Sequence, residues 1–299
     1  MGVLIVGSIA LDTIKTPFRK EKEILGGSAT YSSISARFFS PVHLVAVVGE
    51  DFPKKHINFL RKKGVDLEGL QVEEGKTFRW EGEYGWDFCN PQTIATDLNV
   101  FGEFNPSIPR KYQNTPFVFL ANIDPALQKS VLNQVKKPKL IACDTMNYWI
   151  DNKPKQLLRL LKDIDILLVN ESEAKQLTGK NNLMRAGKSL RRLGPKVVMI
   201  KKGEHGVLLF SDSHIFATPA YLLETIVDPT GAGDTFAGTV IGYLSQCKKL
   251  NQQAIREAVV YGNIMATFTV EDFSVRRLSA VTPADFKQRM KEFRKFTAF

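Results

Sequence analysis

Short apolar runs alternate with helix-like segments along most of this chain, and this alternation restricts the folds it can adopt. After Pro109, the apolar runs cover residues 117–121, 140–143, 166–169, 197–200 and 207–210. Repeated alternation of strands and helices favours an α/β fold, with a mostly parallel sheet and helices on both faces. In such a sheet, ligands bind beyond the C-terminal ends of the strands.

The N-terminal segment is typical of a βαβ unit interrupted by a polar excursion. Residues 3–12 form a buried strand that passes a Gly-Ser turn, so we expect Asp12 at the C-terminal end of this strand. The pair Gly26 and Gly27 precedes a run of small residues suited to a tightly packed helix. The later elements follow in order: a helix at 28–39, a strand at 42–48 and a helix at 52–63.

One region departs from this pattern and predicts a small additional sheet. Residues 77–84 and 93–101 alternate polar with apolar or aromatic side chains, which is typical of half-exposed strands. We expect residues 13–25 and 72–104 to form a β lid on a single domain spanning residues 1–299. The chain has no low-complexity tract, internal repeat or Gly/Ser linker that would argue for a second domain.

Composition and charge argue against several classes of protein. The formal charge is +10, but the basic residues are scattered over helix-like segments without aromatic interleaving, which favours a solvated face over nucleic-acid binding. The apolar runs are far shorter than the roughly 20 residues of a membrane span. The N-terminus lacks the pattern of a secretory signal, so we expect a cytoplasmic protein. Three widely separated cysteines favour neither a disulfide framework nor a zinc site.

The segment Asp228-Pro-Thr-Gly-Ala-Gly-Asp234 carries the sharpest functional signal. A helix-like run follows it directly, so its small residues leave backbone amides free to point at one spot. These amides and the helix dipole suit a phosphate group or a developing negative charge. Asp234 begins the helix and is placed to accept a proton from a hydroxyl. Taken alone, the segment also fits a helix-capping Asp after a glycine-rich turn.

Together with companion segments, this motif resembles the C-terminal signature of the ribokinase-like (PfkB-type) carbohydrate kinase family. The companions are Gly7-Ser8 with Asp12, Gly26-Gly27, Asn170-Glu-Ser-Glu173 and Lys201-Lys-Gly-Glu-His-Gly206. The resemblance implies a ribokinase-like fold and transfer of the ATP γ-phosphate to a hydroxyl of a sugar, a polyol or another sugar-like molecule. A nucleoside kinase of the same fold is the alternative. A non-catalytic sugar-binding protein or a nucleic-acid-binding protein are rival classes, although the first would be expected to have lost Asp234 or the glycines.

The resemblance also implies a role for each matched position. Asp234 is the general base, and the amides of Gly231, Ala232 and Gly233 form the anion hole. The positions assigned to ATP are Asn170, Lys201, Gly203, Gly206 and Thr230. Glu173 organises Mg²⁺ through water, and Asp228 contributes to a monovalent-cation site, for K⁺, found in some relatives.

Acceptor binding is predicted at Asp12 and Gly27 from the resemblance. Asn122 and Asp124 are added because they follow the strand at 117–121. The ribokinase branch has an asparagine where Tyr31 stands, and this departure leaves sugar and nucleoside acceptors both open. The aromatic residues of the lid are compatible with either: Trp80, Tyr84, Trp86 and Phe88. A lid strand could pair with that of a second subunit and give a homodimer, or its edge could stay solvated.

Overall fold

A nine-stranded, mostly parallel sheet forms the centre of the computed structural model, which describes residues 2–88, 91–212 and 214–298. Only the β11–β12 and β12–β13 pairs are antiparallel. In spatial order the strands are β13 (Ile215–Thr218), β12 (Val207–Phe210), β11 (Val197–Lys201), β10 (Ile166–Asn170), β9 (Leu140–Asp144), β8 (Phe117–Leu120), β1 (Val3–Val6), β4 (Val42–Gly49) and β5 (Val65–Glu73).

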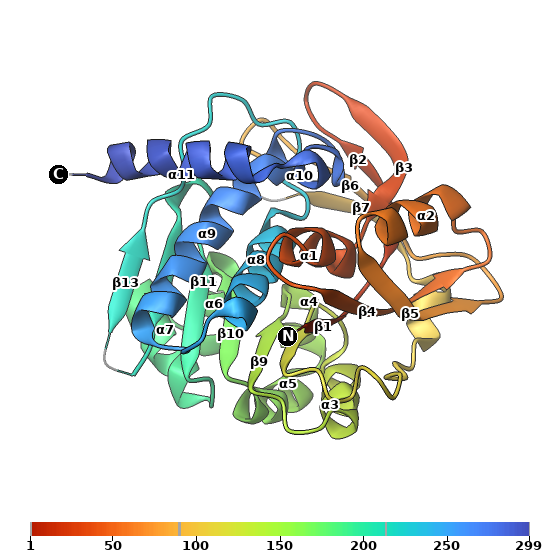
Figure 1. Cartoon of the computed structure of the whole chain (residues 1–299), viewed down its shortest axis with the longest axis horizontal. Coiled ribbons are helices and arrows are strands. Elements are labelled where there is room, and N and C mark those ends of the chain that lie inside the picture. Colours follow the sequence, from red (N-terminus) through yellow and green to blue (C-terminus); the bar gives the residue numbers. More distant parts are fainter. Residues whose placement is uncertain (1, 89–90, 213, 299) are drawn as a thin grey trace.

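Helices cover both faces of this sheet and bury a separate apolar core on each (Figure 1). Because the strands are buried on both faces, they are nearly continuous apolar runs. One face carries α1 (Ser28–Ala36), α2 (Lys54–Lys62), α8 (Ala232–Gln246), α9 (Gln252–Val270), α10 (Arg276–Ala280) and α11 (Pro283–Thr297). The other carries α3 (Pro125–Gln134), α4 (Asn147–Asn152), α5 (Pro154–Leu160), α6 (Glu171–Thr178) and α7 (Leu183–Arg192).

Small residues bring α1 and α8 into backbone contact. A Cβ atom on Gly238 would lie 2.2 Å from the carbonyl oxygen of Ser32, and one on Gly242 would lie 2.8 Å from the Cα of Ala36. Larger residues at either glycine would therefore push the helices apart. This close packing fixes the position of the N-terminus of α8.

A second sheet of four strands lies at the C-terminal edge of the main sheet, since β1 leads into it and so does β5. In Figure 1 it projects beyond α1 and α10. Its order is β3 (Lys20–Gly26), β2 (Ala10–Lys15), β6 (Arg79–Glu83) and β7 (Gln92–Asp97). The β2–β6 pair is parallel and the other two pairs are antiparallel.

The strands predicted after Pro109 are confirmed to within one residue at each end. The prediction for Asp12 is wrong in one respect, because the chain turns at residues 7–9 and Asp12 lies within β2 of the small sheet instead of ending β1. Residues 72 and 73 belong to β5, and residues 99–103 form a 3-10 helix, so both lie outside the small sheet. Among the described residues, no helix has the length and apolar character needed to cross a bilayer.

Candidate active site

Asp234 lies in the first turn of α8, and a left-handed residue, Gly231, precedes this helix. Gly231 has a φ of 78°, and its carbonyl accepts the first helical hydrogen bond, from the amide of Thr235 at 2.8 Å. A Cβ atom here would lie 2.4 Å from ring carbons of Tyr31. Positive φ and the buried ring together require glycine at this position. Tyr31 thus packs beneath the turn as a core residue.

The start of α8 leaves donors for an anion, because the first amides of a helix have no helical acceptor. The amide of Ala232 makes a turn bond of 3.2 Å to the carbonyl of Pro229. Gly233 lies beside a cation, since a Cβ atom on it would lie 3.2 Å from Nζ of Lys201. Amides and an ammonium group therefore converge next to Asp234.

Lys201 and Asp144 form an ion pair within this site. They end the parallel strands β11 and β9, which lie on either side of β10, and Nζ of Lys201 lies 2.8 Å from Oδ2 of Asp144. Burial lowers the pKa of Lys201, but Asp144 and Glu173 outweigh burial and raise it. Lys201 is thus held as a cation.

Burial raises the pKa of Asp234 to about 7, and the charge of Asp144 adds to this rise while Lys201 opposes it. A carboxylate with a pKa near neutrality combines the right protonation state with useful basicity. Perturbed groups of this kind cluster at functional sites. The setting of Asp234 thus suits a general base.

Asp12 faces the same region from the small sheet. A Cβ atom on Gly26 would lie 1.8 Å from Oδ2 of Asp12, so only glycine leaves room for the carboxyl group. Burial raises the pKa of Asp12 to about 8, and the charges of Asp228 and Asp234 add to this rise. A hydrogen bond from the backbone of Gly27 lowers the pKa and offsets part of the rise. Both glycines of the pair therefore contribute to the environment of Asp12: Gly26 leaves space for its carboxyl group, and the backbone of Gly27 donates a hydrogen bond to it.

Asn170 and Glu173 form a capping box at the N-terminus of α6. Oδ1 of Asn170 accepts a hydrogen bond of 2.8 Å from the amide of Glu173, whose carboxylate accepts bonds from the backbone and side chain of Asn170. Burial raises the pKa of Glu173 to about 7, against the lowering effect of Lys201. Among the described residues, no cluster of three or more His, Cys, Asp and Glu side chains could hold a metal directly.

Asp228 and Thr230 form a turn just before the anion site. Oδ1 of Asp228 accepts a hydrogen bond of 2.9 Å from the amide of Thr230, whereas Oδ2 is buried without a hydrogen-bond partner. Burial raises the pKa of Asp228 to about 6, against the lowering effect of Thr230. The hydroxyl of Tyr84 lies 3.1 Å from Oγ1 of Thr230 and links the small sheet to this turn.

Three of the predicted site residues make other contacts, and a fourth lies in an open turn. Asn122 accepts a hydrogen bond of 2.9 Å from Nε1 of Trp149, and Asp124 caps α3 and pairs with Lys153 at 2.9 Å. Gly206 is explained by packing, since its Cβ atom would lie 2.0 Å from the carbonyl oxygen of Thr218. Around Gly203, nothing described lies within 4 Å of a Cβ position, so this turn is open to a ligand.

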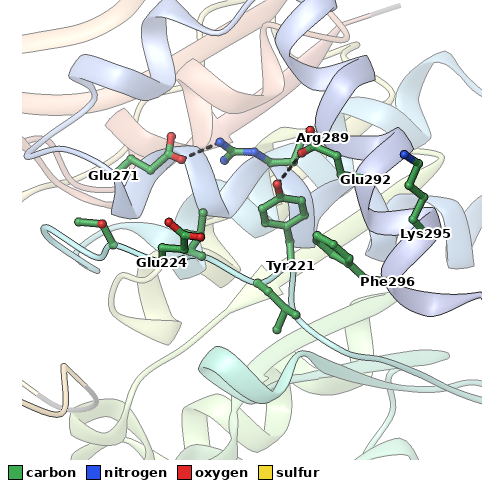
Figure 2. Close-up of a pocket in the computed structure, with 10 residues that line it drawn as sticks. Tyr221, Glu224, Glu271, Arg289, Glu292, Lys295 and Phe296 are labelled. Atoms are coloured by element: carbon green, nitrogen blue, oxygen red, sulfur yellow. Dashed lines mark hydrogen bonds and ion pairs between the residues drawn. The ribbon is translucent and has the colours of Figure 1, made fainter.

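A separate pocket of about 640 Å³ lies between residues 221–225 and α11 (Figure 2). Figure 2 shows the hydroxyl of Tyr221 directed at Glu292, a hydrogen bond of 2.6 Å, and Arg289 paired with Glu271 at 2.6 Å. None of the predicted site residues lines this pocket. Its polar contacts fasten the loop that leads into Asp228.

Sequence reasoning missed the Lys201–Asp144 pair. The motif that begins at Lys201 assigns this residue to ATP, and none of the matched motifs includes Asp144. Both residues end buried apolar runs, which was the available signal. Neighbouring strands are not known until the strand order is known, so the contact could not be derived from sequence.

The profile of the pfkB family of carbohydrate kinases matches residues 6–281. The chain belongs to this family. A cytidine kinase from Thermococcus kodakarensis is 30% identical over 271 residues, which cover 87% of this chain and 96% of that protein. The predicted family and an ATP-dependent kinase activity on a sugar-like acceptor are thereby confirmed.

Solved structures of ribokinase-family proteins share the fold. The nucleoside kinase of Methanocaldococcus jannaschii superposes with a TM-score of 0.77 at 19% identity and covers 98% of this chain and 99% of its own. A candidate ribokinase II from E. coli, solved in complex with ATP and Mg²⁺, gives a TM-score of 0.80 at 20% identity and covers 97% and 99%. The predicted α/β fold of this pfkB-family chain is confirmed.

Proposed function

We propose that Asp234 is the general base of phosphoryl transfer from ATP to an acceptor hydroxyl. The Asp234 carboxylate takes the hydroxyl proton as the oxygen forms a bond to the γ-phosphorus. The bond from that phosphorus to the β,γ-bridging oxygen breaks, and its electron pair leaves with ADP. The place of Asp234 in the first turn of α8, next to the Lys201 ammonium beside Gly233, carries this assignment, and burial that raises its pKa to about 7 supports it.

The anion hole combines the first amides of α8 with Lys201. Gly231, Ala232 and Gly233 supply the backbone donors, the Ala232 amide while sharing its hydrogen with the Pro229 carbonyl at 3.2 Å, and the Lys201 ammonium lies beside Gly233. Charge developing on the transferred phosphoryl group meets donors that are already oriented, which lowers the barrier without reorganisation. Asp144 keeps Lys201 charged and directed at this spot.

The open turn at Gly203 and the cation at Lys201 fit a nucleotide, with Asn170, Gly206 and Thr230 as further contacts to ATP. Mg²⁺ bound with the nucleotide would neutralise charge on the phosphate oxygens. The acids around the site fit a Mg²⁺ that keeps several of its waters, with Glu173 acting through water. The buried, unpartnered Oδ2 of Asp228 fits a monovalent cation such as K⁺.

Acceptor hydroxyls bind Asp12 and the backbone at Gly27 in this proposal, with Asn122 and Asp124 at the rim. The small sheet closes over the acceptor as a lid.

The proposed homodimer and the proposed cytoplasmic location can each be tested directly. A homodimer through the edges of the lid would be detected by light scattering, and a cytoplasmic location by cell fractionation.

A nucleoside is the second candidate acceptor. The cytidine kinase similarity supports it, whereas the tyrosine at position 31 is compatible with either acceptor. Tyr31 is a buried core residue and supplies no amide to a sugar.

The test is a screen of sugars, polyols and nucleosides with ATP and Mg²⁺, comparing the wild type with Asp234→Asn. We expect at least one acceptor to be phosphorylated, and we expect the variant to lose about 10²- to 10⁴-fold in turnover. Asp212→Asn is the matched control, because that carboxylate is 84% exposed and its ion pair is with Arg191 of α7. Wild-type turnover in Asp234→Asn, with substrate binding unchanged, would contradict the assignment.

A further inference from the structure

Trp80 lies beside Asp12 on the small sheet. In the parallel β2–β6 pair, Asp12 is opposite Trp80 and Ile14 is opposite Gly82. Side chains directly across neighbouring strands project from the same face. Ile14, on this same face, packs with Tyr84, whose hydroxyl lies 3.1 Å from Oγ1 of Thr230, so this face is turned toward the turn that precedes α8. Trp80 therefore projects on the acceptor side.

The indole ring of Trp80 is fixed over Gly82. A Cβ atom on Gly82 would lie 2.2 to 2.9 Å from three carbons of the six-membered ring, so the ring covers a position that only glycine leaves free. Its Nε1 donates a hydrogen bond of 3.3 Å to Oγ1 of Thr93, the register partner of Gly82. With the N–H bonded and the ring half-buried, Trp80 offers a ligand mainly an aromatic surface.

The surroundings of this ring are apolar. Trp80 packs against a cluster of buried side chains that includes Ile14, Ile24 and Tyr84. A sugar ring placed there would leave hydroxyls without partners, which costs free energy. A flat aromatic ring has no such groups on its faces and gains by stacking. Asp12 and Trp80 thus match two parts of one acceptor, a hydroxylated part and a flat part.

We propose that Trp80 stacks on the nucleobase of a nucleoside acceptor whose ribose hydroxyls bind Asp12. This proposal rests on the phosphotransfer proposed at Asp234 and identifies its substrate class. Trp80 is a specificity-determining residue, and it takes no part in proton or phosphoryl transfer.

The experiment compares Trp80→Ala and Trp80→Phe with the wild type, using cytidine, uridine, adenosine, inosine and free ribose as acceptors. For the accepted nucleosides we expect KM to rise about tenfold in Trp80→Ala, and by less in Trp80→Phe, which keeps a ring. We expect kcat at saturation to stay within about twofold, since stacking acts equally on ground and transition states. The KM of ribose should not change.

Trp86→Ala is the matched control. This second tryptophan of the lid is 77% exposed and makes an edge contact with Phe18 at 5.3 Å. Its loss should leave every KM unchanged. Nucleoside titration without ATP should quench the tryptophan fluorescence of the wild type and Trp86→Ala but not that of Trp80→Phe.

Two results would overturn the proposal. An equal rise in KM for ribose and nucleosides would mean that Trp80 recognises the sugar, and an unchanged nucleoside KM in folded Trp80→Ala would mean that it recognises neither. Failure of the kinase proposal is distinguishable, because it would appear as the absence of Asp234-dependent turnover. The fluorescence titration detects stacking of the nucleobase on Trp80 without any turnover.

Discussion

The N-terminus of α8 and the small sheet contribute to the same site in different ways. At α8 the groups are backbone amides and buried charges, and the glycines are required by contacts such as that of Gly231 with Tyr31. On the small sheet the groups are side chains, Asp12 and Trp80, carried on strands. The backbone of α8 is suited to chemistry common to any acceptor, whereas side chains on a sheet can be exchanged to suit a new one.

The two regions also differ in how they are held. The N-terminus of α8 is fixed by backbone contacts with α1. The small sheet is held by side chains: Ile14 packs with Phe273 of the main body, the Tyr84 hydroxyl lies 3.1 Å from Oγ1 of Thr230, and Arg276 pairs with Glu21 of β3 at 2.9 Å. The small sheet is thus anchored to the main body through side chains, whereas the start of α8 is anchored through backbone contacts.

The variant Lys201→Met tests whether the groups at the start of α8 act on every acceptor alike. Loss of an oriented cation from the anion hole should lower kcat about 10²- to 10³-fold for every acceptor, measured by steady-state kinetics. The variant also leaves Asp144 buried without its partner and should lower the thermal unfolding temperature.

A double variant separates these two effects. Adding Asp144→Asn to Lys201→Met removes the unpaired charge and should restore stability without restoring kcat. Lys196→Met is the control, because that ammonium is 74% exposed and its ion pair with Asp165 is of the surface type. Recovery of kcat in the double variant would mean that Lys201 acts only on stability.

The variant Asp12→Asn tests whether the small sheet acts on the acceptor alone. Loss of the carboxyl group that binds the acceptor hydroxyls should raise the acceptor KM about 10- to 100-fold and leave the KM of ATP unchanged. An equal change in both KM values would mean that the small sheet is not a separate acceptor platform.

The same variant tests the burial of Asp12 through stability. Folding raises the pKa of this group from 3.8 to about 8, so between these values the folded state holds a proton that the unfolded chain has released. The free energy of unfolding therefore falls as pH rises through this window. Relative to the wild type, Asp12→Asn should gain more in Tm at about pH 8 than at about pH 5, by calorimetry. An equal difference at both values would contradict the raised pKa.

Most of the central sheet could be predicted from the sequence because buried parallel strands are short apolar runs with clear ends. The small sheet was harder. Residues 3–12 are apolar apart from Gly7-Ser8 and Asp12, and their periodicity does not show that the Gly-Ser turn divides them into β1 and β2. Asp12 was therefore identified as a candidate but placed on the wrong strand.

The site was predictable where one segment carries it. The small residues before Asp234 indicate an anion site because conformation and helix start are encoded locally. The Lys201–Asp144 pair and the opposition of Asp12 to Trp80 depend on strand order and register. These are set by long-range packing, which a single sequence does not specify.

The most direct test of the central claim is the pH dependence of kcat/KM for the acceptor. If Asp234 is the general base, the wild type should lose activity on the acid side with a bend near pH 7, where burial places its pKa. Asp12→Asn, which lacks the neighbouring titrating group, should keep this bend, and the residual activity of Asp234→Asn should lack it. A flat wild-type profile, or a bend that survives in Asp234→Asn, would contradict the account.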